Sequence, residues 1–106
     1  MIAPGVKISI KNLSKSTALL PLINLSSNQK NYGKNTIEAI NAGFIWGYEG
    51  LINNIINKII SKNKIKYKII LTGGYANFFK KMIKKNVVVD QDITVKGISN
   101  VYKELL

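Results

Sequence analysis

The clearest candidate for ligand binding is Thr72-Gly73-Gly74, which directly follows an apolar run and precedes a helix-like segment. In open α/β sheets, ligands bind beyond the carboxyl ends of the strands. Two glycines at such a point let a nucleotide lie against the backbone, because no side chain intervenes. A plain tight turn uses the same residues. Taken alone the motif favours the turn, since neither a P-loop nor a GxGxxG pattern occurs in the chain.

A second candidate is Gly33-Lys34-Asn35-Thr36, which places a flexible glycine, a cation and a hydroxyl at the start of a predicted long helix. The positive end of a helix attracts a carboxylate or a phosphate. Asn35 with Glu38 also forms a capping box, which satisfies the first free amides of a helix without any ligand. Taken alone, the motif favours simple capping, with Lys34 in solvent.

Acid–base and metal chemistry depend on five carboxylates, because the chain has no histidine and no cysteine. Of these, only Asp90 and Asp92 lie close together in the sequence. They could bind a metal ion, but no third ligand is nearby, and a hard cation such as calcium takes six or more oxygens. We therefore predict that Asp92 caps the following helix, that Asp90 lies in a turn, and that the chain has no metal site.

The net charge of +11 is typical of proteins that bind nucleic acid or another acidic surface. All 16 basic residues are lysine, however. Arginine, the usual reader of guanine edges, is absent. A surplus of lysine, isoleucine and asparagine is also what an A/T-rich coding bias produces. We favour this compositional drift and predict no nucleic-acid partner, with a basic nucleic-acid-binding protein as an alternative.

Hydrophobic spacing predicts the elements that position these residues. A helical segment opens at Pro4 and runs to about Leu20, and a short extended piece follows over 22–25. A long helix then spans 36–61.

Small residues recur at a spacing of four on this long helix, at Ala39, Gly43 and Gly47. A glycine in a helix interior costs about 1 kcal/mol relative to alanine. We therefore expect a second helix to approach this stripe closely. The helix also carries a carboxylate, a lysine and several asparagines, which excludes a membrane dimer motif.

The second half of the chain alternates strands and helices. A buried strand is predicted over 67–71, a helix over 75–85, a strand over 87–89 and a last helix over 93–105. This order indicates the α/β class. With no run of about 18 apolar residues and no signal peptide, the chain is predicted to lie in the cytoplasm without a membrane contact. A domain of this size buries only about 60–70% of its unfolded surface, so a partner would help it fold.

Taken together, the motifs resemble the C-terminal half of type III pantothenate kinases. They occur in the family's order, which is Ile2-Ala3-Pro4-Gly5, Gly33-Lys34-Asn35-Thr36-Ile37-Glu38-Ala39, Gly43, Gly47-Tyr48-Glu49-Gly50-Leu51, Thr72-Gly73-Gly74 and Asp92-Ile93-Thr94-Val95-Lys96-Gly97-Ile98. The resemblance spans essentially the whole chain, 1–106, as one C-terminal half-domain. The ordered set is more specific than any single motif, and it reverses the preference for a plain turn and for simple capping.

The resemblance implies the actin-like, ribonuclease-H-like ATPase fold, built from two α/β halves with ATP in the cleft. It implies that ATP phosphorylates the terminal hydroxyl of pantothenate to give 4'-phosphopantothenate, the first step of coenzyme A biosynthesis. Mg²⁺ and a monovalent cation, K⁺ or NH₄⁺, assist this reaction. Family members are homodimers whose interface contains the helix matching 36–61, which would account for the small-residue stripe.

Residue by residue, Thr36 matches the threonine that contacts pantothenate, and Thr72, Gly73 and Gly74 match the adenosine-side motif. Tyr75 stands where a smaller aliphatic residue is usual, which affects the shape expected for the adenine pocket.

The parts of the family that do the chemistry have no match in this sequence. They are an Asp-x-Gly-Asn-Thr phosphate loop, a Gly-x-Asp-Arg segment with the catalytic base, and a second phosphate motif that helps to hold the monovalent cation. Phosphoryl transfer depends on positioning and charge stabilisation at the phosphates. We therefore expect no catalytic residue here, and an enzyme fragment that is active only with the missing N-terminal half. The alternative is a non-catalytic dimerisation or accessory module. The kinase hypothesis requires that 33–36 and 72–74 open onto a common cleft.

Overall fold

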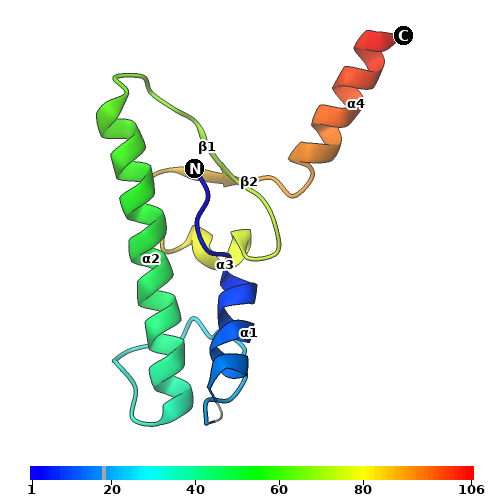
Figure 1. Ribbon diagram of the computed structural model, residues 1–106. Helices are drawn as coiled ribbons and strands as arrows, with labels where there is room; N and C mark the ends of the chain where they lie inside the picture. The colour runs from blue at the N-terminus through cyan, green and yellow to red at the C-terminus, as the bar shows by residue number, and fades with distance from the viewer. Residues whose placement is uncertain (18) are drawn as a thin grey trace. The chain divides into compact units, whose positions relative to one another are not determined.

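The computed structural model describes residues 1–17 and 19–106 (Figure 1). The helices and strands in this part of the chain are α1 (Val6–Ser16), α2 (Thr36–Lys62), β1 (Ile69–Leu71), α3 (Ala76–Lys80), β2 (Val87–Val89) and α4 (Ile93–Leu105). The chain divides into two compact units, Met1–Ile52 and Asn53–Leu106, called unit 1 and unit 2 below.

In unit 1, α1 is shorter than its hydrophobic pattern predicts. The helix was expected to reach about Leu20 but ends at Ser16, and Ala18 lies outside the described residues. Thr17 has an extended backbone (φ −127°, ψ 129°). Its hydroxyl donates a hydrogen bond of 2.7 Å to the Leu13 carbonyl, one of the acceptors that a helix end leaves free. The threonine thus terminates α1 one turn early.

The core of unit 1 is held together by a buried amide. Asn41 of α2 is only 6% exposed and lies among the buried apolar residues of this unit. Its Nδ2 donates to the Ser26 carbonyl at 2.9 Å and to Gln29 Oε1 at 2.8 Å, and its Oδ1 accepts from the Ser26 amide at 2.8 Å. These bonds fix the 22–29 loop on the helix. No strand forms over 22–25, contrary to expectation, although Ile23 is buried there.

In unit 2 a second buried amide, that of Asn53, fixes the segment that follows α3. Asn53, 9% exposed, donates from Nδ2 to the Met82 carbonyl at 2.9 Å and accepts at Oδ1 from the Lys84 amide at 2.9 Å. The Met82 carbonyl and the Lys84 amide are therefore bonded to a side chain instead of continuing a helix. This explains why the helix expected over 75–85 is limited to Ala76–Lys80.

The sheet of unit 2 consists of two parallel strands, with Ile69, Ile70 and Leu71 opposite Val87, Val88 and Val89. A hydrogen bond of 2.9 Å from the Asp90 amide to the Leu71 carbonyl extends the pairing. This β-α-β arrangement confirms the α/β class. The first strand was predicted over 67–71 as buried. It is shorter, and Ile70 is 39% exposed, so the described residues cover that face only in part.

Candidate functional site

The loop after β1 carries one group of candidate site residues, in unit 2. Thr72, Gly73 and Gly74 are all exposed at the carboxyl end of the strand. Gly73 has φ +97°, a conformation that side-chain-bearing residues rarely adopt. A Cβ atom built on Gly73 or Gly74 would meet nothing within 4 Å. The glycine bend therefore leaves open space beside its backbone, as a ligand lying against it would require.

A glutamine from the neighbouring strand end holds this bend in place. The Gly73 amide donates to Gln91 Oε1 at 3.2 Å, and Gln91 Nε2 donates to the Gly73 carbonyl at 2.9 Å. The side chain thus links the loops that follow β1 and β2. The sequence patterns did not identify Gln91, although its position directly after the second parallel strand is one where ligand-binding and loop-positioning residues gather.

The carboxylates beside this glutamine act differently from the expectation. Asp92 precedes α4 but makes no side-chain capping bond. Asp90 Oδ1 instead accepts from the Asp92 amide at 3.0 Å, and Asp90 Oδ2 pairs with Lys96 Nζ at 2.9 Å. Asp92 occupies the N-cap position as expected, but the prediction that its side chain caps α4 is wrong, because it makes no side-chain capping bond.

These bonds shift the pKa values of Asp90 and Lys96 in opposite directions. The hydrogen bond from Lys96, with that from the Asp92 amide, lowers the pKa of Asp90 below its ordinary value of 3.8. The hydrogen bond to Asp90 raises the pKa of Lys96 above 10.5. Both groups are therefore charged at neutral pH, and they stabilise the junction between β2 and α4.

Tyr75, which follows the glycine bend, is half-buried. Its ring contacts Phe78 edge-on with centroids 6.3 Å apart, and Phe79 at 6.2 Å. The aromatic ring that departs from the family pattern therefore belongs to a cluster of rings on α3.

The start of α2 carries the other group of candidate site residues, in unit 1. Asn35 Oδ1 accepts from the Glu38 amide at 2.9 Å, as the capping box predicts. Glu38 Oε2 reaches one residue further back than expected and accepts from the Lys34 amide at 2.8 Å. Thr36 is exposed, and within the described residues its hydroxyl makes no hydrogen bond. Capping and ligand contact are thus compatible, because different side chains would perform them.

Gly33 explains why this helix start has its shape. It has φ +97°, and a Cβ atom there would collide with the backbone of Glu38 and Ala39. Only glycine allows the chain to fold this tightly against the first turn. A polar hollow of about 260 Å³ adjoins the bend. Its lining residues are Asn28, Gln29, Lys30, Asn31, Lys34 and Glu38.

The predicted site residues fall into two groups. Thr72, Gly73 and Gly74 share one loop of unit 2, whereas Thr36 belongs to unit 1. Among the residues described, no three acidic side chains come together as a metal site would need, and no helix is long and apolar enough to cross a membrane.

Comparison with known proteins assigns the chain to a family. A family model described as type III pantothenate kinase matches residues 1–58. The type III pantothenate kinase of Pelagibacter ubique is 50% identical over 80 residues, which are 76% of this chain and 32% of that protein. The enzymes of Ruegeria sp. and Dictyoglomus turgidum are 38% and 41% identical over 80 and 75 residues, covering 76% and 71% of this chain and 31% and 29% of those proteins. The chain thus spans about a third of the length of these relatives. It belongs to the type III pantothenate kinase family.

Proposed function

We propose that this chain is the C-terminal half-domain of a type III pantothenate kinase and supplies substrate-binding residues for the ATP-dependent phosphorylation of pantothenate to 4'-phosphopantothenate. The observation that carries the proposal is the open glycine bend after β1, which the resemblance matches to the family's adenosine-side motif. This half-domain would belong to an actin-like ATPase fold. We place the reaction, the first step of coenzyme A biosynthesis, in the cytoplasm, where ATP is the phosphate donor.

On the nucleotide side, Thr72, Gly73 and Gly74 would receive the adenosine part of ATP. All three are exposed, and neither glycine has an atom within 4 Å of the place where a side chain would be. The clamp from Gln91 keeps the bend in one conformation. A preorganised bend binds a ligand without a further cost in chain entropy.

On the acceptor side, Thr36 would contact pantothenate. Its hydroxyl is exposed at the first residue of a 27-residue helix, whose positive end favours a carboxylate such as that of pantothenate. Lys34 is exposed beside it and adds a positive charge. Asn35 and Glu38 already satisfy the capping bonds, so Thr36 is available for the substrate.

The chemical step itself would need groups from outside this chain. Phosphoryl transfer requires a residue that orients or deprotonates the attacking hydroxyl, and metal ions that neutralise the phosphates. Asp90, which is near the glycine bend, is engaged with Lys96. We therefore assign binding of adenosine and pantothenate to this chain. The catalytic base and the sites for Mg²⁺ and for K⁺ or NH₄⁺ would lie in the other part of the kinase.

The stripe on α2 supports a homodimer as part of this proposal. A Cβ atom on Gly43 or Gly47 would meet nothing within 4 Å, so no helix of the described chain makes the close approach that the stripe predicts. The two glycines line a largely apolar hollow of about 420 Å³. Its other lining residues are Pro4, Leu13, Phe44, Tyr48 and Leu51. The α2 helix of a second copy would fill this space, and a pure dimerisation module would use the same surface.

A chimera tests the function without relying on association of separate chains. In it, this chain replaces the region that it matches in the Pelagibacter ubique kinase, and ATP-dependent phosphorylation of pantothenate is measured. We expect activity, and about a tenfold rise in KM for pantothenate in Thr36→Val, which corresponds to about 1.4 kcal/mol. Thr36→Ser keeps the hydroxyl and should retain the low KM. A folded chimera without activity would contradict the proposal.

A further inference from the structure

The sheet of unit 2 is incomplete as it stands. Two parallel strands of three residues each form the whole of it within the described residues. Sheets generally need three or more strands to be stable alone, and parallel sheets are normally covered on both faces. Ile70 and Val88 are paired in register and therefore share one face, where they are 39% and 48% exposed. This face is thus only partly covered, and no third strand extends either edge of the sheet within the described residues.

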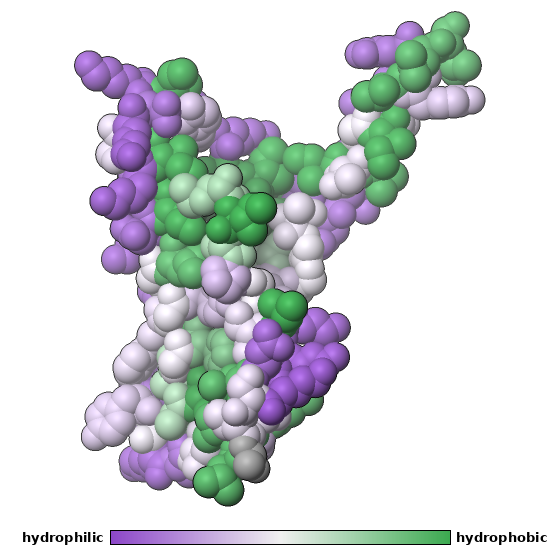
Figure 2. All heavy atoms as spheres, viewed as in Figure 1, coloured by the Kyte–Doolittle hydropathy of each residue, from purple (hydrophilic) through white to green (hydrophobic). Residues whose placement is uncertain are grey.

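The last helix of the same unit also lacks a neighbour. No residue of α4 is buried, and Figure 1 shows the helix leading away from the two strands. Apolar side chains recur along it at helical spacing, with Val95, Ile98, Tyr102 and Leu105 each between 63% and 80% exposed. Figure 2 shows hydrophobic residues in green along the helix. We call these four residues the α4 stripe.

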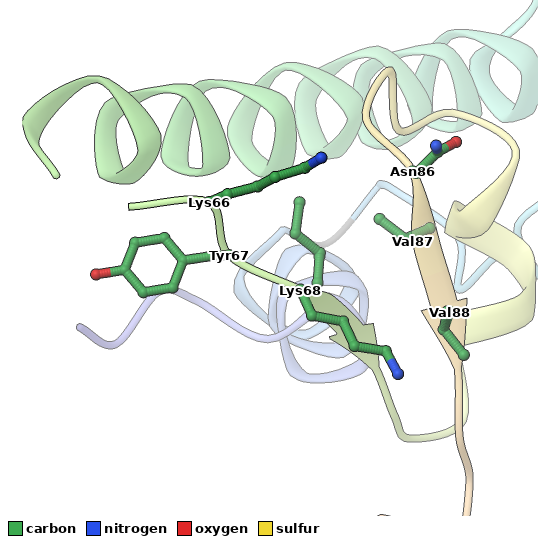
Figure 3. A pocket seen from close by; sticks show the side chains of 7 residues that line it. Lys66, Tyr67, Lys68, Asn86, Val87 and Val88 are labelled. Carbon is green, nitrogen blue, oxygen red and sulfur yellow. The ribbon is translucent and has the colours of Figure 1, made fainter. Parts of the chain in front are cut away.

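A hollow of about 540 Å³ lies where the two strands begin, and its walls are partly apolar (Figure 3). Its lining residues are Lys66, Tyr67, Lys68, Ile69, Asn86, Val87 and Val88. The amino groups of Lys66 and Lys68 point to different sides in Figure 3, so they do not converge on one anion. The hollow therefore fits a missing piece of protein better than a small charged ligand.

We infer that the α4 stripe and the open Ile70–Val88 face together form the surface that receives the rest of the kinase. The inference rests on the proposed function. The matched 80 residues are only 32% of the Pelagibacter ubique enzyme, so about twice that length of related polypeptide has no counterpart here. That length is sufficient to supply further strands and a covering layer. The occupant is thus the polypeptide corresponding to the unmatched part of the relatives, called the complementary fragment below.

The first test measures binding of this chain to the complementary fragment of the Pelagibacter ubique enzyme by sedimentation velocity. Ile98→Lys, in the middle of the stripe, should weaken the complex at least tenfold, because the lysine would have to be buried. Ser99→Lys adds the same charge next to the stripe and is the matched control, with affinity close to that of the unaltered chain. Equal affinity for both variants would overturn the inference. So would a dimer of this chain alone that Ile98→Lys converts to monomers while fragment binding is unchanged, because a second copy would then be the occupant.

A second measurement keeps the inference testable if the isolated fragment does not fold. In the isolated chain, Ile98 is 66% exposed, so Ile98→Lys should leave the melting temperature unchanged. In the chimera the same substitution should lower it, whereas Ser99→Lys should not. A chimera insensitive to Ile98→Lys would contradict the inference even if it phosphorylates pantothenate. A chimera that is destabilised by Ile98→Lys but has no activity would contradict the proposed function and leave the docking surface supported.

Discussion

Two glycine bends in this chain share one backbone conformation and differ in their surroundings. Gly33 and Gly73 both have φ +97°. At Gly33 the space of a side chain is occupied by the backbone of Glu38 and Ala39, whereas at Gly73 it is open. Each bend stands at a motif that the resemblance links to a substrate. The difference indicates that Gly33 shapes the start of α2 for structural reasons, and that Gly73 and its neighbour Gly74 leave room for a ligand.

The largest effect is expected from Gly33→Ala. The methyl group would collide with the first turn of α2 in addition to the strain of a positive φ, so the free energy of unfolding should fall by about 3 kcal/mol or more. Chemical denaturation measures this. Gly73→Ala is the matched control, because it has the same φ without the collision, and it should cost only about 1–2 kcal/mol. Equal losses at the two positions would contradict the contrast between a filled and an open bend.

A smaller effect should follow from loss of the glutamine clamp. Gln91→Met keeps the length of the side chain but removes both hydrogen bonds to Gly73, with an expected loss of about 1 kcal/mol in the free energy of unfolding. In the chimera, the KM for ATP should rise while the KM for pantothenate stays the same. A rise in both, or in neither, would show that the clamp does not act on the nucleotide side.

The sequence predicted features that depend on neighbouring residues, but not those that depend on tertiary packing. Glycine, the cap residue Asn35 and the hydrophobic period identified α2, the parallel strands and α4, since these signals are local. The sequence could not say which glycine has a filled side-chain space, because that depends on how Gly33 meets Glu38 and Ala39.

The amide clamps were missed for a related reason. Asn53 and its counterpart Asn41 look like ordinary polar positions on a helix surface, yet both are buried and bind loops distant in sequence. Their partners depend on tertiary packing, as does the reach of Gln91 to Gly73. The resemblance to the family supplied Thr36 and Thr72 as site residues, and this part of the site stays a prediction.

The small-residue stripe of α2 can be tested with a substitution that should stabilise the monomer and weaken the dimer. Gly47→Ala and Gly50→Ala each place a methyl group in open space on α2, so each should raise the free energy of unfolding of the monomer by about 1 kcal/mol. Gly47 lines the apolar hollow and Gly50 does not. Only Gly47→Ala should therefore weaken a dimer, as measured by sedimentation equilibrium. A dimer equally tolerant of both changes would remove α2 from the interface.

The smallest effect concerns the ion pair between Asp90 and Lys96. Because the pKa of Asp90 is lowered on folding, its stabilisation is present above its ordinary value of 3.8 and is lost as the pH falls through the lowered pKa. The pKa of Lys96 is raised, so its contribution is present below 10.5 and is lost as the pH rises through the raised pKa. Asp90→Asn should thus have a lower free energy of unfolding than the unaltered chain mainly at pH values between the pKa of Asp90 and the pKa of Lys96. A constant difference through the acid transition would contradict the pairing.

The most direct test of the central claim uses Gly74→Val in the chimera. Gly74 does not have a positive φ, and a Cβ atom built there meets nothing within 4 Å, so the free energy of unfolding should stay within about 0.5 kcal/mol. If adenosine lies against this bend, the valine must displace it, and the KM for ATP should rise at least tenfold, or about 1.4 kcal/mol, with no change in the KM for pantothenate. An unchanged KM for ATP in a folded, active Gly74→Val chimera would contradict the assignment of this loop to the nucleotide.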